Sequence, residues 1–96
     1  MATLTRAALR KRVSHGLGVK RSVVRAVIGR FLEEVMEVLV RGDRVELRDF
    51  GVFDVREFGP KRCRDMARGR EMVMPAYRVV KFRAGRVLCR ALSRRA

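Results

Sequence analysis

The sequence predicts an α+β fold: two N-terminal helices, a three-stranded antiparallel sheet with a long β-ribbon arm, and a short C-terminal helix. Three observations carry this prediction. Apolar residues recur every three or four positions over about residues 20–41, the period of an amphipathic helix. Apolar and charged residues alternate between residues 44 and 57, the period of a half-buried strand. Residues 61–70 are rich in arginine and lack an apolar face, so this stretch is expected to leave the core and return.

The first helix is expected to begin behind an N-cap threonine, Thr3 or Thr5, and to end near His15, where Gly16 and Gly18 mark a turn. The second helix, over residues 20–41, carries an apolar stripe wide enough to serve both the first helix and a second subunit. The stripe consists of Val24, Val27, Ile28, Phe31, Leu32, Val35 and Leu39.

Two strands, residues 44–47 and 50–57, are expected to be joined by a tight turn at Arg48-Asp49. Gly51, between two phenylalanines, suggests a bulge or a close backbone approach. The arm would follow, with Gly59-Pro60 near its base and Pro75 at an edge position or a bend on the return.

The length of 96 residues suits one small domain. Because the arm takes residues from the core, dimerisation is an attractive way to bury more apolar surface. The expected parts of this single domain, residues 1–96, are a helical base over about 3–42, the sheet and arm over 44–82 with the arm tip at 59–70, and a last helix over 84–93.

The formal net charge of +14 is extreme for this length and favours a nucleic-acid partner, with an anionic membrane surface as the second interpretation. Residues 56–96 carry a net +10 and residues 1–55 only +4, so the surplus belongs to the arm and the C-terminal segment. Arginine greatly outnumbers lysine. This suits minor-groove insertion and bidentate phosphate contact, but a GC-rich genome is an equally good explanation.

Other classes of function find little support. No apolar run of membrane-spanning length and no secretory signal is present. The two cysteines form no metal-ligand spacing with the lone His15, which suits a reducing, cytosolic setting. No activated nucleophile, paired carboxylates or phosphate-cradling glycine loop suggests an enzyme, and no cofactor is expected.

The sequence resembles the HU and integration host factor family of bacterial nucleoid proteins over nearly its whole length, from Thr5 to Leu92. The matching positions are Phe50, Gly51 and Phe53 in the sheet; Arg64 and Gly69 at the arm tip; Met74, Pro75 and Ala76 on the return; and Phe82, Gly85, Arg86 and Leu88 around the start of the last helix. The resemblance implies an intertwined dimer whose helices form a base and whose two arms wrap the minor groove of DNA.

The chain departs from the family at the arm tip, whose usual signature is glycine-arginine-asparagine-proline-any-threonine-glycine. Residues 63–69 keep only Arg64 and Gly69 of it. The tip proline that wedges between base pairs in the family falls on Met66, an apolar side chain able to act as a wedge. Asp65 is a like charge to phosphate and should weaken contact there.

The resemblance and the charge pattern together assign phosphate and minor-groove contacts, with a merely solvated basic ribbon as the alternative. The expected arm contacts are Arg56, Lys61, Arg62, Arg64, Met66, Arg68 and Arg70. The expected contacts nearer the body are Arg48, Arg78, Lys81, Arg83 and Arg86, with Arg78 where the returning arm meets the body.

The expected function is that of an architectural, largely sequence-nonspecific protein that bends or compacts double-stranded DNA in the cytoplasmic nucleoid. It would act as a homodimer, or as a heterodimer with a paralogue, and without a small-molecule substrate. Two alternatives stay open. One is a site-specific bender of the integration host factor type, since the minor-groove code is degenerate. The other is a divergent protein that coats or bridges DNA without bending it, which Asp65 and the missing tip proline favour.

Overall fold

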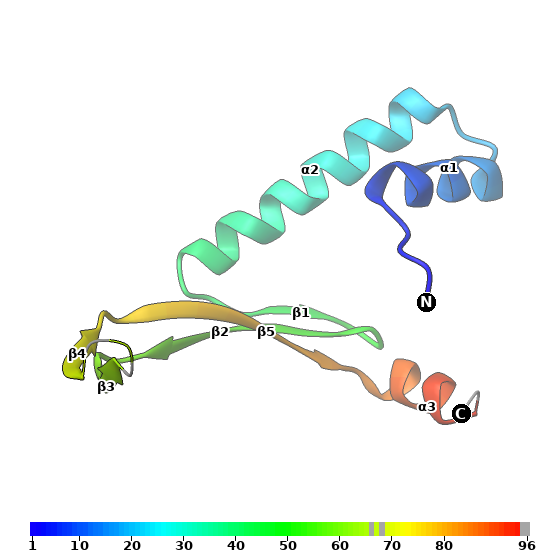
Figure 1. Ribbon diagram of the computed structural model, residues 1–96. Coiled ribbons are helices and arrows are strands. Elements are labelled where there is room, and N and C mark those ends of the chain that lie inside the picture. The colour runs from blue at the N-terminus through cyan, green and yellow to red at the C-terminus, as the bar shows by residue number, and fades with distance from the viewer. Residues whose placement is uncertain (66, 68, 95–96) are drawn as a thin grey trace. The chain divides into compact units, whose positions relative to one another are not determined.

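The computed structural model (Figure 1) describes residues 1–65, 67 and 69–94, with the backbone alone for residues 61–65 and 74. The chain divides into two compact units, residues 1–37 and 38–96. The element order is α1 (Arg6–Leu17), α2 (Arg21–Val40), β1 (Val45–Leu47), β2 (Gly51–Phe58), β3 (Lys61–Asp65), β4 (Arg70–Met74), β5 (Tyr77–Ala84) and α3 (Arg86–Arg94).

The first unit contains α1 and most of α2. Thr5 is the N-cap of α1, because its hydroxyl accepts a hydrogen bond from the Ala8 N–H at 3.2 Å. The predicted end near His15 is too early. The helix continues through Gly16 to Leu17, and Gly18, not Gly16, adopts the left-handed conformation (φ 65°) that ends it. The bounds of α2 agree with the predicted helix to within one residue at each end.

The second unit is built on a three-stranded antiparallel sheet, as predicted, and its strand order is β1-β2-β5. The tight turn at Arg48-Asp49 is confirmed. The Phe50 N–H donates to the Leu47 carbonyl at 3.0 Å, and Asp49 has a φ of 67°. Both strand pairs keep a continuous register through Gly51, so this glycine serves a close backbone approach and not a bulge.

The arm is interrupted at its base. Its strands β3 and β4 form a separate two-stranded sheet. The register nevertheless continues across the interruption, because the offset that pairs Phe58 with Tyr77 also pairs Lys61 with Met74. That alignment sets Pro60 opposite Pro75 in the break. Neither proline has an N–H to donate, which explains why the ladder stops there.

The last helix, α3, begins later than the predicted residue 84. Ala84 is still paired with Gly51 in the sheet, and the Gly85 N–H donates to the Phe50 carbonyl at 2.7 Å. Among the residues with described side chains, no helix is long and apolar enough to cross a membrane.

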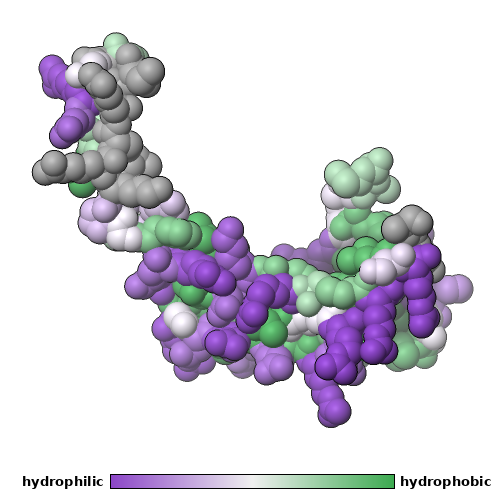
Figure 2. All heavy atoms as spheres, turned by 90° about the horizontal axis from the view of Figure 1, so that it is seen from below, coloured by the Kyte–Doolittle hydropathy of each residue, from purple (hydrophilic) through white to green (hydrophobic). Residues whose placement is uncertain are grey.

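Little apolar surface is buried in the single chain. Val24, at 4% exposure, is the one buried hydrophobic side chain in the part of the chain that the structure describes. Hydrophobic residues are visible on the face shown in Figure 2. The exposed large hydrophobic residues include Val27 and Phe31 on α2, and Val80 and Phe82 on β5. Folding into one subunit therefore leaves part of the α2 stripe and part of one sheet face exposed, while the other stripe residues except Val24 are only half-buried.

Candidate nucleic-acid interface

The two faces of the β2–β5 pair differ sharply in chemistry. Directly opposed residues of antiparallel strands share a face. We call one side the charged face. It holds Val52, Asp54, Arg56 and Phe58 of β2 opposite Arg83, Lys81, Val79 and Tyr77 of β5. The other is the apolar face, with Gly51, Phe53, Val55 and Glu57 opposite Ala84, Phe82, Val80 and Arg78.

The apolar face is organised by aromatic contacts. The ring centroids of Phe53 and Phe82 are 4.8 Å apart, and those of Phe50 and Phe82 are 5.4 Å apart. Such tilted pairs add to the stability gained by burial. This packing turns the alternate residues of β2 and β5, including three of the predicted DNA contacts, toward the charged face.

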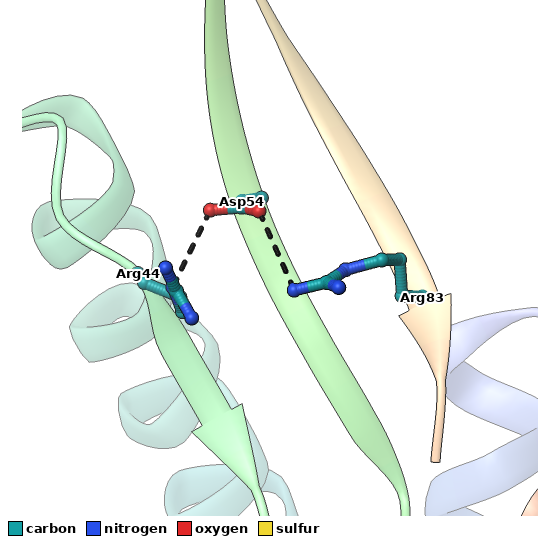
Figure 3. A network of polar contacts seen from close by, with 3 residues as sticks. All are labelled: Arg44, Asp54 and Arg83. Atoms are coloured by element: carbon teal, nitrogen blue, oxygen red, sulfur yellow. Dashed lines mark ion pairs between the residues drawn. The ribbon is translucent and has the colours of Figure 1, made fainter.

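Asp54 lies between two arginines on the charged face (Figure 3). Its Oδ1 is 3.5 Å from Arg44 Nε, just before β1, and its Oδ2 is 3.8 Å from Arg83 Nη2 on β5. The carboxylate side chain is only 21% exposed, whereas both arginine side chains are about 60% exposed. Asp54 thus holds two open guanidinium groups over the sheet while it cancels part of their charge.

Arg56 and Lys81 extend the same face toward the arm. Both are exposed, and they lie one rung apart, because Arg56 pairs with Val79 and Asp54 pairs with Lys81. Together with Arg44 and Arg83, they supply four cations against the nearby carboxylates of Asp54 and Glu46. The face is therefore suited to phosphate.

Arg48 and Arg86 come together at the end of the sheet farthest from the arm. Both line a shallow recess that also includes Glu46, Val52 and Gly85. Glu46 pairs with Val52, which is a residue of the charged face. The structure therefore brings these two predicted contact residues to the edge of that face, although they are far apart in the sequence.

Arg78 is separated from the other predicted contacts. Its register partner is Glu57 on the apolar face. Its Nη1 atom lies 3.8 Å from the position that a Cβ on Gly42 would occupy, so its guanidinium approaches the connection between α2 and β1. Arg78 as a DNA contact stays a prediction, but it does not belong to the charged face.

On the arm, backbone pairing fixes the positions of the predicted residues. Lys61, Arg62 and Arg64 lie on β3, and Arg70 begins β4. Asp65 is opposite Arg70, and Arg64 is opposite Glu71. Each acidic residue of these strands thus lies opposite a basic residue. The two strands together carry more basic than acidic residues, so the ribbon is basic. The predicted contacts Met66 and Arg68 lie outside the described residues.

Sequence reasoning missed an aromatic pair on the charged face. Phe58 and Tyr77 form its last rung before the proline break, with ring centroids 5.2 Å apart and ring planes inclined by 23°. The two residues are 39% and 44% exposed. The sequence contained a signal for this pair. Phe58 lies two residues before Pro60, and Tyr77 lies two residues after Pro75. An antiparallel pairing that sets the two prolines opposite each other therefore also sets the two aromatic residues opposite each other. Arg44 was also missed, since it was assigned only to the start of a strand.

A sheet with one strongly cationic face, continued by a basic two-stranded ribbon on a chain of net charge +14, defines a nucleic-acid-binding protein. Residues 4–93 match the family described as bacterial DNA-binding protein, and the chain belongs to that family. The family comprises the HU and integration host factor proteins, which are architectural DNA-binding proteins. The predicted resemblance and the predicted HU-like fold are therefore confirmed.

Relatives of both kinds match nearly the whole chain. A probable DNA-binding protein HU from Chlamydia pneumoniae is 39% identical over 93 residues, which cover 96% of this chain and 93% of the relative. Integration host factor subunit alpha from Shewanella frigidimarina is 34% identical over 85 residues, which cover 88% and 86%.

Solved structures show the same fold. HU in an Anabaena HU–DNA cocrystal structure superposes with a TM-score of 0.82 at 29% identity, over 93% of this chain and 97% of that one. An HU mutant from Thermotoga maritima superposes with a TM-score of 0.68 at 24% identity, over 92% and 97%.

Proposed function

We propose that this protein is a largely sequence-nonspecific architectural protein that bends or compacts double-stranded DNA. The observation that carries the proposal is the charged face of the sheet. Beyond the proline break, the basic ribbon of β3 and β4 continues with the same strand register as β2 and β5. Cations on such a surface bind the phosphate backbone by releasing counterions, which requires no particular base sequence. The HU–DNA cocrystal structure with the same fold supports DNA as the ligand.

The active form is proposed to be a homodimer, with a heterodimer of paralogues as the alternative. The support is the open apolar surface of the single chain, since Val24 is the one hydrophobic side chain buried among those described. At about 25 cal/mol per Å² of apolar area, covering the stripe of α2 and the apolar face of the sheet is a strong drive to associate. Both units, residues 1–37 and 38–96, would then act as one DNA-binding domain.

Two arms, one from each subunit, would follow the minor groove. The contacts assigned to this wrapping are those of the charged face (Arg56, Lys81 and Arg83), those of the recess (Arg48 and Arg86), and the arm residues Lys61, Arg62, Arg64, Arg68 and Arg70. Met66 would replace the tip proline as a wedge. We assign the protein to the cytoplasmic nucleoid, without a catalytic role or a cofactor.

Two further functions are favoured by particular observations. The match to integration host factor subunit alpha favours a site-specific bender. Asp65 and the absence of a tip proline favour a protein that coats or bridges DNA without bending it. Mobility shifts on linear, nicked and four-way-junction DNA of equal length separate these functions. We expect tighter binding to the distorted forms, whereas equal affinity for all three would indicate coating.

Salt dependence tests the assignment of the contact face. A dimer that neutralises about 6–10 phosphates should show a slope of log affinity on log salt of roughly −5 to −9. Each dimer carries two copies of every side chain, so Arg56→Gln or Lys81→Gln should make the slope shallower by about 2. Arg78→Gln is the comparison variant, because it removes the same charge from the apolar face; Arg78 stays a predicted DNA contact, but one outside the charged face, so its effect on the slope should be smaller.

Three results would count against this assignment. A wild-type slope shallower than about −2 would contradict extensive phosphate contact. An Arg78→Gln effect as large as that of Arg56→Gln would contradict the division of the sheet into two faces. Deletion of residues 61–70 should weaken binding while circular dichroism shows an unchanged helix content. Full affinity after that deletion would remove the arm from the interface.

A further inference from the structure

A recess lies between the two helices of the first unit. Its volume of about 640 Å³ falls within the usual range of small-molecule sites. Four of the residues that line it are cations, two from α1 and two from the start of α2: Arg10, Lys11, Arg21 and Arg25. The recess lies wholly within residues 1–37, whereas the charged face of the sheet belongs to residues 38–96. It is therefore a separate basic feature of the molecule.

The sequence around the recess contains no carboxylate to balance these cations. Residues 1–32 hold eight basic side chains and no acidic one, and the first acidic residue of the chain is Glu33. Acidic residues then outnumber basic ones over residues 33–54. The modest net charge of the N-terminal half thus conceals two segments of opposite sign, and the recess lies in the positive one.

The structure confirms that the cations of the recess are unpaired. Arg30, farther along α2, forms an ion pair with Glu34 at 2.8 Å. Among the described residues, none forms such a pair with the four cations of the recess, and the first turn of α2 carries no acidic residue. Arg21 and Arg25 are four residues apart on one side of α2, where like charges repel each other. A bound anion would remove that repulsion.

The shape of the recess favours a compact ligand with several negative charges. The other lining residues, Ala7, Ala8 and Ser22, have small side chains, which leaves space between the long cationic ones. Guanidinium groups match the oxygens of phosphate through paired hydrogen bonds. A single carboxylate would meet only one or two of the four cations. A short chain of phosphate groups carries adjacent charges that the cations from both helices can meet together.

We propose that this recess binds a compact oligophosphate, with one site per subunit. The recognised chemistry is a run of adjacent phosphate groups, which either a nucleoside triphosphate or an inorganic polyphosphate supplies. The inference does not rest on the proposed function, because no residue of the recess belongs to the charged face or to the arm. Occupation of the site would lower the positive charge of the helical unit and leave the contacts assigned to DNA unoccupied.

The test is isothermal titration calorimetry at low salt, where exposed charges are least screened, with inorganic triphosphate, ATP and orthophosphate as probes. Arg10→Gln and Arg25→Gln each remove one cation of the recess, one from each helix. Arg12→Gln is the matched control, because it removes the same charge from α1 at a residue that does not line the recess. Duplex affinity is measured for every variant, and amide chemical shifts of the wild type locate the bound triphosphate.

We expect one triphosphate to bind per subunit, ATP to bind with similar affinity, and orthophosphate to bind much more weakly. Arg10→Gln and Arg25→Gln should each lose about 10-fold in affinity for triphosphate. Arg12→Gln should lose about twofold at most, since it changes only the general charge. The largest chemical-shift changes should fall on Ala7, Ala8 and Ser22.

Four results would overturn the site. An equal loss in Arg12→Gln would show that triphosphate responds only to overall charge. Shift changes centred on β2 and β5 would place the anion on the charged face. Binding of ATP without binding of triphosphate would make the nucleoside, and not the phosphate chain, the recognised group. A loss of duplex affinity in the recess variants as large as their loss for triphosphate would assign the recess to DNA contact.

Failure of the proposed function has a different signature. If the wild type binds triphosphate in the recess but fails to bind the duplex, the architectural function is wrong and the oligophosphate site stands. If the wild type binds the duplex with the expected salt slope and the recess variants bind triphosphate like the wild type, the oligophosphate site is wrong and the architectural function stands.

Discussion

Replacement of Gly51 by alanine should destabilise the protein more than any other glycine-to-alanine change in the described sheet. A Cβ at this position would lie 2.5 Å from Phe82 Cε1 and 2.6 Å from the carbonyl oxygen of Arg83. Carbon contacts are favourable at about 3.5–4.0 Å. The added methyl group therefore requires a local separation of β2 and β5 by about 1 Å. Rotation of the Phe82 ring relieves only one of the two clashes, because the carbonyl belongs to the backbone.

The expected loss follows from what that separation disturbs. Gly51 pairs with Ala84, and Phe82 also packs on Phe50 and Phe53. Overpacking of a well-fitted site costs about 1–3 kcal/mol and occasionally more. With strained ladder hydrogen bonds included, we expect a loss of about 3 kcal/mol. For a domain of this size such a loss lowers Tm by roughly 12–24 °C.

The assay is thermal and urea unfolding followed by circular dichroism, at equal protomer concentration because association contributes to stability. Gly59→Ala is the matched control. No atom lies within 4 Å of its added Cβ, and it stands between the two ladders, so its stability should change by less than about 1 kcal/mol. If the Gly51→Ala and Gly59→Ala proteins unfold within about 0.5 kcal/mol of each other, the close approach does not govern the stability of the sheet.

Further outcomes are expected. Sedimentation equilibrium at micromolar concentration should give a dimer, and a single 11.0 kDa species would contradict the open apolar surface as an interface. Asp54→Asn should raise DNA affinity a few-fold at low salt by removing an anion from the charged face, and weaker binding would show that the carboxylate mainly positions its two arginines. Pro60→Ala combined with Pro75→Ala should join the two ladders and increase amide-exchange protection at the arm base; unchanged protection would mean that the prolines do not cause the break. Met66→Ala should reduce the DNA bend measured by fluorescence transfer between duplex ends, with little loss of affinity, and an unchanged bend would exclude the wedge.

The sequence by itself determined the local elements. The period of the α2 stripe, the Thr5 cap, and the turn at Arg48-Asp49 are encoded within a few residues, so they were predictable to within one or two positions. The end of α1 was not, because Gly16 and Gly18 both permit a stop and only the observed backbone selects Gly18. The basic arm was predictable from its lack of apolar residues, since a stretch with nothing to bury cannot join a core.

The tertiary structure alone decided which residues share a surface. Register between β2 and β5 depends on a pairing across about 25 intervening residues, and a shift by one residue exchanges the two faces. Charge counting therefore grouped Arg78 with Lys81, whereas the observed register puts them on opposite sides of the sheet. The same register brings Phe58 to Tyr77, and Asp54 to Arg83. Composition reports how much charge a chain carries, but only strand pairing reports which side chains a ligand meets together.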